Sequence, residues 1–367
     1  MVTPIKAIKA LSLTPTGKAC VSKMTGPINQ RKSEHIQISL NENVTGDTIT
    51  TGFEKVKFIH NALPEINFSD ISIDTTFLGH ECKTPFLISS MTGGAAFAET
   101  INRNLAEAAE ERGWGLALGS TRALIESAEH RSSFQVKKYA PSIPIIANLG
   151  AVQLNYGFGV DECLRIIEIT EANSLVLHLN SIQEVIQPEG NTNFENLLEK
   201  IGQLCNAMEV PVGVKEVGWG IDGATAKRLC DVGVSFIDVA GAGGTSWSQV
   251  EKFRSTSLVK RIAAEAFSDW GIPTVECISS VRGRIGKQPI IASGGIHTGL
   301  DGAKAIALGA DIVGFGRSIL KEATLSTKDV LEAMEIKELE LRMAMFGIGV
   351  ASLGELKETD RINYQVY

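Results

Sequence analysis

From residue 85 onward, short apolar runs alternate with stretches in which apolar positions have helical spacing. Eight apolar runs predict strands over 85–90, 115–118, 143–149, 174–179, 212–217, 236–240, 290–293 and 312–316. The stretches between them predict helices over 96–112, 120–138, 160–171, 193–208, 222–231, 246–287 and 299–308. Near-continuous apolar strands that alternate with helices are typical of parallel strands buried on both faces. Eight such units predict an α/β fold, a (β/α)8 TIM barrel, with an open doubly wound sheet as the alternative.

Residues 31–84 precede the first barrel unit and have a pattern of their own. Two segments with alternating apolar and polar positions, 70–74 and 77–81, predict a hairpin. This segment implies no separate core, so we expect it to form an N-terminal cap or floor packed on the barrel. The chain then divides into an extension at 1–30, the cap at 31–84 and the barrel with its C-terminal helices at 85–367.

The first 33 residues contain six basic residues and no acidic one. They lack the apolar run of a secretory signal, contain three prolines and have no arginine before Arg31, which disfavours a targeting peptide. A flexible basic extension is the favoured interpretation. A further hypothesis is that translation starts at Met24 instead of Met1. Mass spectrometry of the native protein that finds residues 1–23 intact would exclude a start at Met24.

Charge and cysteine content narrow the function classes. The formal net charge is −7, so the molecule repels polyanions at long range and a nucleic-acid-binding protein is disfavoured. The uncharged stretch 139–160 contains prolines, glycines and amides, which indicates a strand and a loop instead of a membrane span. The six cysteines form no C-x-x-C pair, which is typical of reduced thiols in a cytoplasmic protein.

A barrel places its site at the carboxyl ends of the strands, where this chain is rich in glycine and polar residues. The runs that follow the eight strands are 89–94, 119–122, 148–150, 178–184, 215–218, 240–247, 293–297 and 314–317. The last two read Ser-Gly-Gly-Ile-His and Gly-Phe-Gly-Arg, and loops at these positions commonly bind phosphate through backbone N–H groups.

Several charged residues at the strand ends admit more than one interpretation. Lys215 could form a structural ion pair or an imine, but its position favours a cation beside a flavin ring. His178 could be a core histidine or a functional one. Glu184 is a single carboxylate, which suffices for Mg²⁺ if the substrate is a diphosphate. Arg122 and the pair at 31–32 are candidate donors to such an anion.

Taken together, five segments resemble the type 2 isopentenyl-diphosphate isomerases, in order from residue 31 to about 350. They are Arg31-Lys32-Ser33-Glu34-His35-Ile36, Ser89-Ser90-Met91-Thr92-Gly93-Gly94, His178-Leu179-Asn180 with Gln183-Glu184, the loop 241–247, and Ser293-Gly294-Gly295-Ile296. The first and third are the most specific, since Gly-Gly-Ile and Gly-x-Gly loops occur in many FMN barrels. The resemblance implies a flavoprotein that interconverts isopentenyl and dimethylallyl diphosphate with FMN, Mg²⁺ and NADPH as reductant.

The resemblance also implies roles for individual residues. FMN contacts would fall on Ser89, Ser90, Met91, Thr92, Ser120, Asn148, Lys215, Thr245, Gly295, Ile296, His297, Gly316 and Arg317. Substrate contacts would fall on Arg31, Lys32, Ser120, Thr121, Arg122 and Gln183. Gln183 and Glu251 would be catalytic, and Glu184 would bind Mg²⁺. Members of this family are usually homo-oligomers, here a tetramer or octamer, and an apolar helix expected at 339–353 could serve an interface.

Two features depart from the family pattern, namely the long acid-free stretch before Arg31 and His297 at a position where arginine is common. The main alternative is another FMN-dependent TIM-barrel oxidoreductase. An α-hydroxy-acid oxidase would need a histidine near the glycines of 240–247, and a purine-nucleotide dehydrogenase would need a cysteine in a glycine-rich loop; the chain has neither. A non-catalytic ligand-binding barrel would bind no flavin, and the polar strand ends argue against it.

Overall fold

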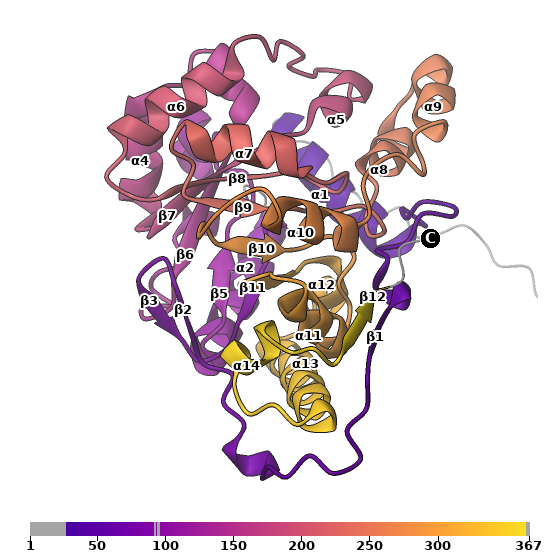
Figure 1. Ribbon diagram of the computed structural model, residues 1–367. Helices are drawn as coiled ribbons and strands as arrows, with labels where there is room; N and C mark the ends of the chain where they lie inside the picture. Colours follow the sequence, from indigo (N-terminus) through magenta and orange to yellow (C-terminus); the bar gives the residue numbers. More distant parts are fainter. Residues whose placement is uncertain (1–26, 92, 94–95, 365–367) are drawn as a thin grey trace, which may run out of the picture.

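Eight parallel strands form a closed barrel in the computed structural model, which describes residues 27–91, 93 and 96–364 (Figure 1). Around the barrel, neighbouring strands follow the order of the chain, and the last pairs with the first. They are β4 (Phe86–Ile88), β5 (Gly115–Ala117), β6 (Ile145–Gly150), β7 (Ser174–His178), β8 (Val212–Lys215), β9 (Phe236–Asp238), β10 (Ile290–Ala292) and β11 (Ile312–Phe315). The TIM-barrel prediction is confirmed, and each strand lies within its predicted apolar run except β6, which extends one residue beyond its run, to Gly150.

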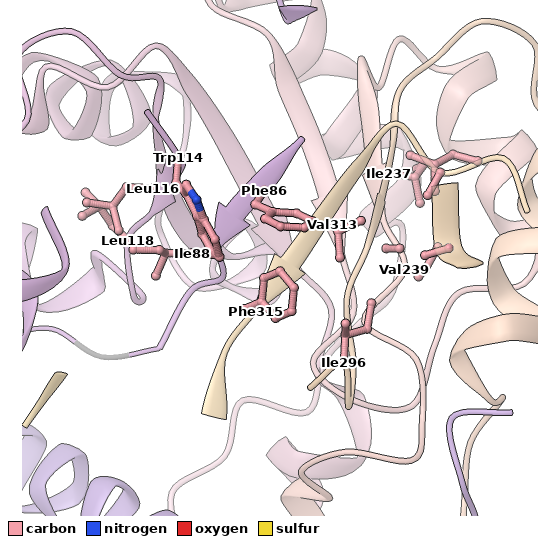
Figure 2. Close-up of a cluster of buried hydrophobic side chains, with 14 of the residues drawn as sticks. Phe86, Ile88, Trp114, Leu116, Leu118, Ile237, Val239, Ile296, Val313 and Phe315 are labelled. Atoms are coloured by element: carbon pink, nitrogen blue, oxygen red, sulfur yellow. The ribbon is translucent and has the colours of Figure 1, made fainter. Parts of the chain in front are cut away.

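Each strand is apolar on both faces because one face packs against helices and the other fills the barrel. Outward side chains join the main core. There the rings of Phe86, Trp114 and Phe315 pack together, with their centroids 5.0 to 5.4 Å apart (Figure 2). Inward side chains form a separate cluster at the amino end of the barrel. It contains Leu87, Ala117, Ile146, Val176, Phe236, Ile291 and Ile312.

The helices that cover the barrel mostly match the predicted stretches. They are α2 (Ala96–Arg112), α4 (Val160–Thr170), α6 (Leu197–Ala207), α7 (Gly223–Asp231) and α11 (Gly299–Ala307). Two single-helix predictions were wrong. The stretch 120–138 contains α3 (Arg122–Glu126) and the 3-10 helix η3 (Ala128–Phe134), because Ser127 is extended.

The stretch 246–287 holds three helices instead of one. They are α8 (Trp247–Arg254), α9 (Leu258–Glu265) and α10 (Thr274–Arg282). Ser255 is extended and ends α8, and the Ser257 side chain accepts a hydrogen bond from the Lys260 N–H at the start of α9. Gly271, with φ +130°, and Pro273 then separate α9 from α10. A further short helix, α5 (Ser181–Ile186), follows β7.

The segment before the barrel contributes to both of its ends. Helix α1 (Pro27–Asn41) lies at the carboxyl end, whereas the hairpin β2 (Thr75–Phe77) and β3 (His80–Cys82) closes the amino end (Figure 1). Phe77 and Cys82 of the hairpin pack into the inner apolar cluster. A hairpin was predicted here, but its strands lie elsewhere: 70–74 holds no strand, and the predicted second strand 77–81 contains the turn at 78–79. This part of the chain shares the barrel core, and the domain boundaries stay a prediction.

A two-stranded ribbon and several short helical segments complete the fold. Strand β1 (Val56–Phe58) pairs with β12 (Ile362–Tyr364) in an antiparallel ribbon, and the 3-10 helices η1 (Phe53–Lys55) and η2 (Phe68–Asp70) flank β1. Shorter helical segments are η4 (Ala151–Asn155), η5 (Arg317–Ile319), α12 (Leu320–Ala323) and α14 (Leu353–Lys357).

The C-terminal helix differs from its predicted bounds. Helix α13 (Thr327–Ile348) begins twelve residues earlier than the predicted 339–353 and ends at Gly349, which has φ +77°. Its outer face exposes Ile336, Leu339 and Met343, so the interface assigned to it stays a prediction. Within the described residues, none of the helices has both the length and the apolarity needed to cross a membrane.

Candidate active site

A ring of polar and small residues lies one layer above the inner apolar cluster. Side chains alternate between the faces of a strand, so the residue two positions after each inward apolar residue also faces inward. That second layer consists of Ser89, Gly119, Asn148, His178, Lys215, Asp238, Ser293 and Gly314. All but Asp238 line a large cavity at the carboxyl end of the barrel. The alternation of side chains along the strands therefore fills the barrel interior with an apolar layer. The polar second layer above it forms the floor of the cavity.

Most of the residues assigned from the sequence line this one cavity. They are Arg31, Lys32, Ser89, Ser90, Met91, Ser120, Arg122, Asn148, Gln183, Glu184, Lys215, Thr245, Gly295, Ile296, His297, Gly316 and Arg317. Two others do not line it. Thr121 is fully buried and donates its hydroxyl to the Asn148 carbonyl oxygen at 2.6 Å, and Glu251 lies behind the cavity wall. Thr92 lies outside the described residues.

One end of the cavity has the features of a phosphate site. Gly294 and Gly295 have φ values of +102° and +68°, which favour glycine. A Cβ on Gly314 would lie 2.4 Å from Ser89 Oγ and 3.1 Å from Ser293 Cβ, so a larger residue would force the Ser89 hydroxyl out of its position. Buried polar atoms of this end, on Ser89, Ser90, Arg317 and Ser318, have no hydrogen-bond partner among the described residues. Buried donors without partners are costly, so this end fits a bound anionic group such as the phosphate of FMN.

Two basic side chains beside this end, His297 and Arg317, have lowered pKa values. Burial lowers the pKa of His297, and the nearby charge of Arg317 lowers it further. Burial also lowers the pKa of the Arg317 guanidinium. His297 is therefore mainly neutral at pH 7, and a bound phosphate would reverse part of this effect.

Lys215 and His178 occupy neighbouring positions in the floor. Lys215 Nζ donates to the Glu216 carbonyl oxygen at 2.6 Å and lies 4.0 Å from Asp238 Oδ2. Burial lowers the pKa of His178 to about 3, and the charge of Lys215 contributes. The neutral ring of His178 lies with Nδ1 2.8 Å from Asn148 Oδ1. The floor thus presents one cation and one neutral imidazole to the cavity.

The loop after β8 is fixed by a buried carboxylate. Glu216 Oε2 accepts hydrogen bonds from the N–H groups of Val217, Gly218 and Trp219 at 2.6 to 2.8 Å. Burial raises the pKa of Glu216 to about 7, against these hydrogen bonds and the charge of Lys215. The Lys215 backbone is thereby held at the cavity edge.

The opposite side of the cavity is built around Glu184. Its two oxygens accept hydrogen bonds from Asn180 Nδ2 at 2.8 Å, Gln187 Nε2 at 2.5 Å and the Asn191 N–H at 2.6 Å. No group of three or more His, Cys, Asp or Glu side chains that could hold a metal occurs in the described part of the chain. Glu184 fits Mg²⁺ only as a single protein ligand, with substrate oxygens and water completing the shell.

Three cations face this side from two different elements. Arg31 and Lys32 come from α1, and Lys32 Nζ donates to the Ser120 carbonyl oxygen at 3.1 Å. Burial lowers the pKa of Lys32 to about 7, and the charge of Arg31 adds to this effect. Arg122 donates to Glu126 and to Asn191 Oδ1. Their convergence on one cavity fits a dense anion such as a diphosphate.

Glu251 joins three elements behind this wall. Its Oε1 accepts from Gln183 Nε2 at 3.1 Å and lies 3.0 Å from His35 Nε2, which must donate because a carboxylate only accepts. Its Oε2 accepts from Arg254 at 2.5 Å. Burial raises the pKa of Glu251, but His35 and Arg254 outweigh this effect and lower it to about 2. The structure thus places Glu251 as a support for Gln183, without contact to the cavity.

Sequence reasoning left several lining residues without a role. His35 and Ser39 line the cavity from α1, and their spacing of four and eight residues from Arg31 places them on the same helical face. That spacing is a signal which could have identified them. Gln153 and Gln187 also line the cavity, but nothing in their local pattern indicates it.

Known proteins resemble this chain at the level of both sequence and fold. The family model FMN-dependent dehydrogenase matches residues 26–141 and 167–363. The isopentenyl-diphosphate delta-isomerase of Oceanobacillus iheyensis is 59% identical over 336 residues, covering 92% of this chain and 96% of that protein. The proteins of the same name from Nostoc sp. and Rickettsia akari are 48% and 47% identical, covering 90% of this chain and 94% and 96% of theirs.

Solved structures show the same fold at low sequence identity. A mandelate oxidase with (S)-2-phenylpropionate has a TM-score of 0.63 and 18% identity, with 92% of this chain and 97% of that chain covered. A flavocytochrome b2 variant with sulfite bound has a TM-score of 0.66 and 17% identity, with 91% and 83% covered. At this identity the likeness concerns the fold alone. From the sequence relatives and the family model, the chain belongs to the type 2, FMN-dependent isopentenyl-diphosphate delta-isomerases.

Proposed function

We propose that this protein interconverts isopentenyl diphosphate and dimethylallyl diphosphate, with FMN in the barrel mouth, NADPH as the reductant and Mg²⁺ on the substrate. The observation that carries the proposal is the union of two anion-binding ends in one cavity. Ser89, Gly295 and Arg317 lie at one end, and Arg31, Lys32 and Arg122 lie at the other. A flavin phosphate and a diphosphate substrate each need such an end.

FMN supplies, when bound and reduced, an electron-rich ring that can exchange a proton with the allylic carbons, so the reaction has no net redox change. The unpartnered hydroxyls of Ser89 and Ser90 and the guanidinium of Arg317 would hold its phosphate end. Lys215 would place its ammonium beside the ring edge. Asn148 and Thr245 would contact the remaining polar edge, since both line the floor and wall between these residues.

The substrate diphosphate would lie between α1 and the loops after β5 and β7. Arg31, Lys32 and Arg122 provide positive charge there, and Ser120 lines the cavity beside them. Mg²⁺ would bind Glu184 and the diphosphate together. This arrangement fixes the charged end of the substrate and leaves its short hydrocarbon end toward the floor, where the flavin ring would lie.

Gln183 is the residue we propose to act on the hydrocarbon end. Its side chain lines the cavity and is held by Asn180 at 3.2 Å and by Glu251 at 3.1 Å. Because Gln183 Nε2 already donates to Glu251, its position is defined before substrate binds. Such an amide can hold a water molecule or orient the hydrocarbon end by hydrogen bonding, in line with the allylic carbons. Thr121 would not touch the substrate. Its hydroxyl donates to the Asn148 carbonyl oxygen and so holds the backbone of a residue that lines the cavity.

The apolar stripe of Ile336, Leu339 and Met343 supports a homo-oligomeric assembly, a tetramer or octamer. We further propose that the protein acts in the cytoplasm, where its cysteines stay reduced. The five cysteines of the described residues are all free thiols.

The test is isomerisation in D₂O. Purified protein is incubated anaerobically with FMN, NADPH, Mg²⁺ and isopentenyl diphosphate, and NMR follows both isomers and their deuterium. We expect dimethylallyl diphosphate that carries solvent deuterium, formed only when the flavin is reduced. Bound FMN without isomer would favour another FMN-barrel oxidoreductase, and no FMN binding would refute the proposal altogether. Omission of Mg²⁺ is the matched control for the role of Glu184.

A further inference from the structure

Asp238 is a buried acid within the polar floor that the proposed chemistry does not use. It pairs directly with Lys215 in the β8–β9 register, and Lys215 pairs with His178 in the β7–β8 register. His178, Lys215 and Asp238 therefore form a row across three neighbouring strands. Asp238 is 3% exposed and does not line the cavity, whereas the other two do.

The contacts of Asp238 connect two lining residues. Its Oδ1 accepts a hydrogen bond from Ser293 Oγ at 2.5 Å, and its Oδ2 lies 4.0 Å from Lys215 Nζ. The Ala240 N–H also donates to this carboxyl. Ser293 lies two residues beyond Ile291, the partner of Asp238 in β10, so its side chain projects from the same face. One carboxyl on β9 thus holds a cation from β8 and a hydroxyl from β10.

A carboxyl at this depth needs a compensating charge. Burial of an unpaired carboxylate is unfavourable by several kcal/mol, and the same holds for an unpaired ammonium. Lys215 and Asp238 are both almost fully buried, with side-chain exposures of 9% and 5%. Burial raises the pKa of Asp238, whereas the charge of Lys215 and the hydrogen bonds from Ser293 and Ala240 oppose this rise and favour the carboxylate. The neutral His178 on the other side of Lys215 adds no charge.

We propose that Asp238 is a positioning residue that directs Lys215 and Ser293 and offsets the lysine charge beneath the bound flavin, which lowers the flavin reduction potential. The inference rests on the proposed function, since it places FMN in the cavity above this floor. Reduction adds electron density to the ring. A nearby negative charge therefore weakens the binding of reduced FMN more than that of oxidised FMN.

The test compares the midpoint potential of FMN bound to the wild type and to Asp238→Asn. The amide keeps the shape but removes the charge, so the potential should rise. A single buried charge corresponds to about a tenfold change in the relative affinity for the two flavin states, or about 30 mV for a two-electron couple. FMN dissociation constants for the oxidised protein are measured in parallel. The surface variant Asp231→Asn, which removes the same charge from α7, should leave the potential unchanged.

A double variant keeps the test decisive if Asp238→Asn does not fold. Lys215→Met alone should lower the potential, because Asp238 then lacks its counter-charge. The pair Lys215→Met with Asp238→Asn removes both charges, which buried sites often tolerate, and should return the potential toward the wild-type value. Equal potentials in Lys215→Met and the double variant across a pH series, including alkaline pH where the unpaired Asp238 is ionised, would refute the proposal. The same holds if Asp238→Asn folds, binds FMN and has an unchanged potential.

These outcomes are separable from failure of the proposed function. Wild-type protein that binds FMN and isomerises the diphosphate, together with an unmoved potential in Asp238→Asn, would overturn only the role of Asp238. Wild-type protein that binds no FMN would overturn the proposed function itself. A purely structural role for Asp238 would lower stability or FMN affinity without moving the potential.

Discussion

Replacement of Glu251 by glutamine tests how the wall behind the site is held together. Glu251 is 1% exposed and joins His35 on α1, Gln183 on α5 and Arg254 on α8. Its pKa is lowered from 4.5 to about 2, because the contacts with His35 and Arg254 outweigh the opposing effect of burial. Burial lowers the pKa of His35, so its ring is mainly neutral at pH 7 and donates to Glu251 as a neutral group. The magnitude therefore rests on the buried pair of Glu251 with Arg254, because removing one charge from such a pair typically costs about 3 kcal/mol.

The sign of the pH dependence follows from the lowered pKa. The stability contributed by Glu251 is fully present above pH 4.5 and is lost as the pH falls through about 2. Glutamine cannot accept a hydrogen bond from Arg254 through its amide nitrogen, so Glu251→Gln should lose the whole contribution at pH 7. At pH 3 much of the wild-type contribution is already lost. The difference in the free energy of unfolding between the two proteins should then be about half of its value at pH 7.

Urea unfolding followed by circular dichroism measures the difference, at one protein concentration and in the absence of ligands. We expect Glu251→Gln to lose about 3 kcal/mol at pH 7 with an unchanged m-value. The matched control is Asp231→Asn, which breaks the exposed pair with Lys227 and should change stability by less than about 1 kcal/mol. A loss in Glu251→Gln as small as in the control, or one that does not shrink toward pH 3, would refute the reasoning.

Further variants test the two ends of the cavity. Gln183→Ala should lower the turnover number by about tenfold or more. The dissociation constant of FMN, measured by fluorescence titration, should stay unchanged. Glu184→Ala should raise the Mg²⁺ concentration for half-maximal activity by about tenfold or more, measured by metal titration. Because burial and Arg31 lower the pKa of Lys32 to about 7, kcat/KM for the diphosphate should fall as the pH rises through 7. This fall should be absent in Lys32→Arg, and a pH–rate profile of both proteins decides it. Gly314→Ala places a Cβ 2.4 Å from the Ser89 hydroxyl and should weaken FMN binding by about tenfold, as titration would show.

The sequence alone was sufficient to predict the strands and much of the cavity lining. Each barrel strand is buried on both faces, so its apolar run is visible without knowledge of its neighbours. Polar and glycine residues directly after these runs, such as Ser89, Lys215 and Gly295, line the cavity because all parallel strands end on the same side. The segment motifs indicated the family, which the sequence relatives confirm.

Other features depended on contacts between distant parts of the chain. The roles of Thr121 and Glu251 could not be predicted, because their neighbours come from other elements: Asn148 for the first, and His35 and Gln183 for the second. The breaks in 120–138 and 246–287 were missed because helical spacing continues across each break, at Ser127 in the first stretch and at Ser255 and Pro273 in the second.

The order of apolar and polar residues along each strand therefore determined the fold and which side of it carries the chemistry. This order is a local property, since burial on two faces and alternation of side chains follow from one strand at a time. Only the tertiary structure decided which charges meet. Closure of the barrel places Asp238 beside Lys215 and Ser293, and packing of α1 and α8 places His35 and Arg254 on Glu251. The pKa of a buried charge is set by its nearest neighbours in space, and His35, for example, lies 216 residues from Glu251 in the sequence.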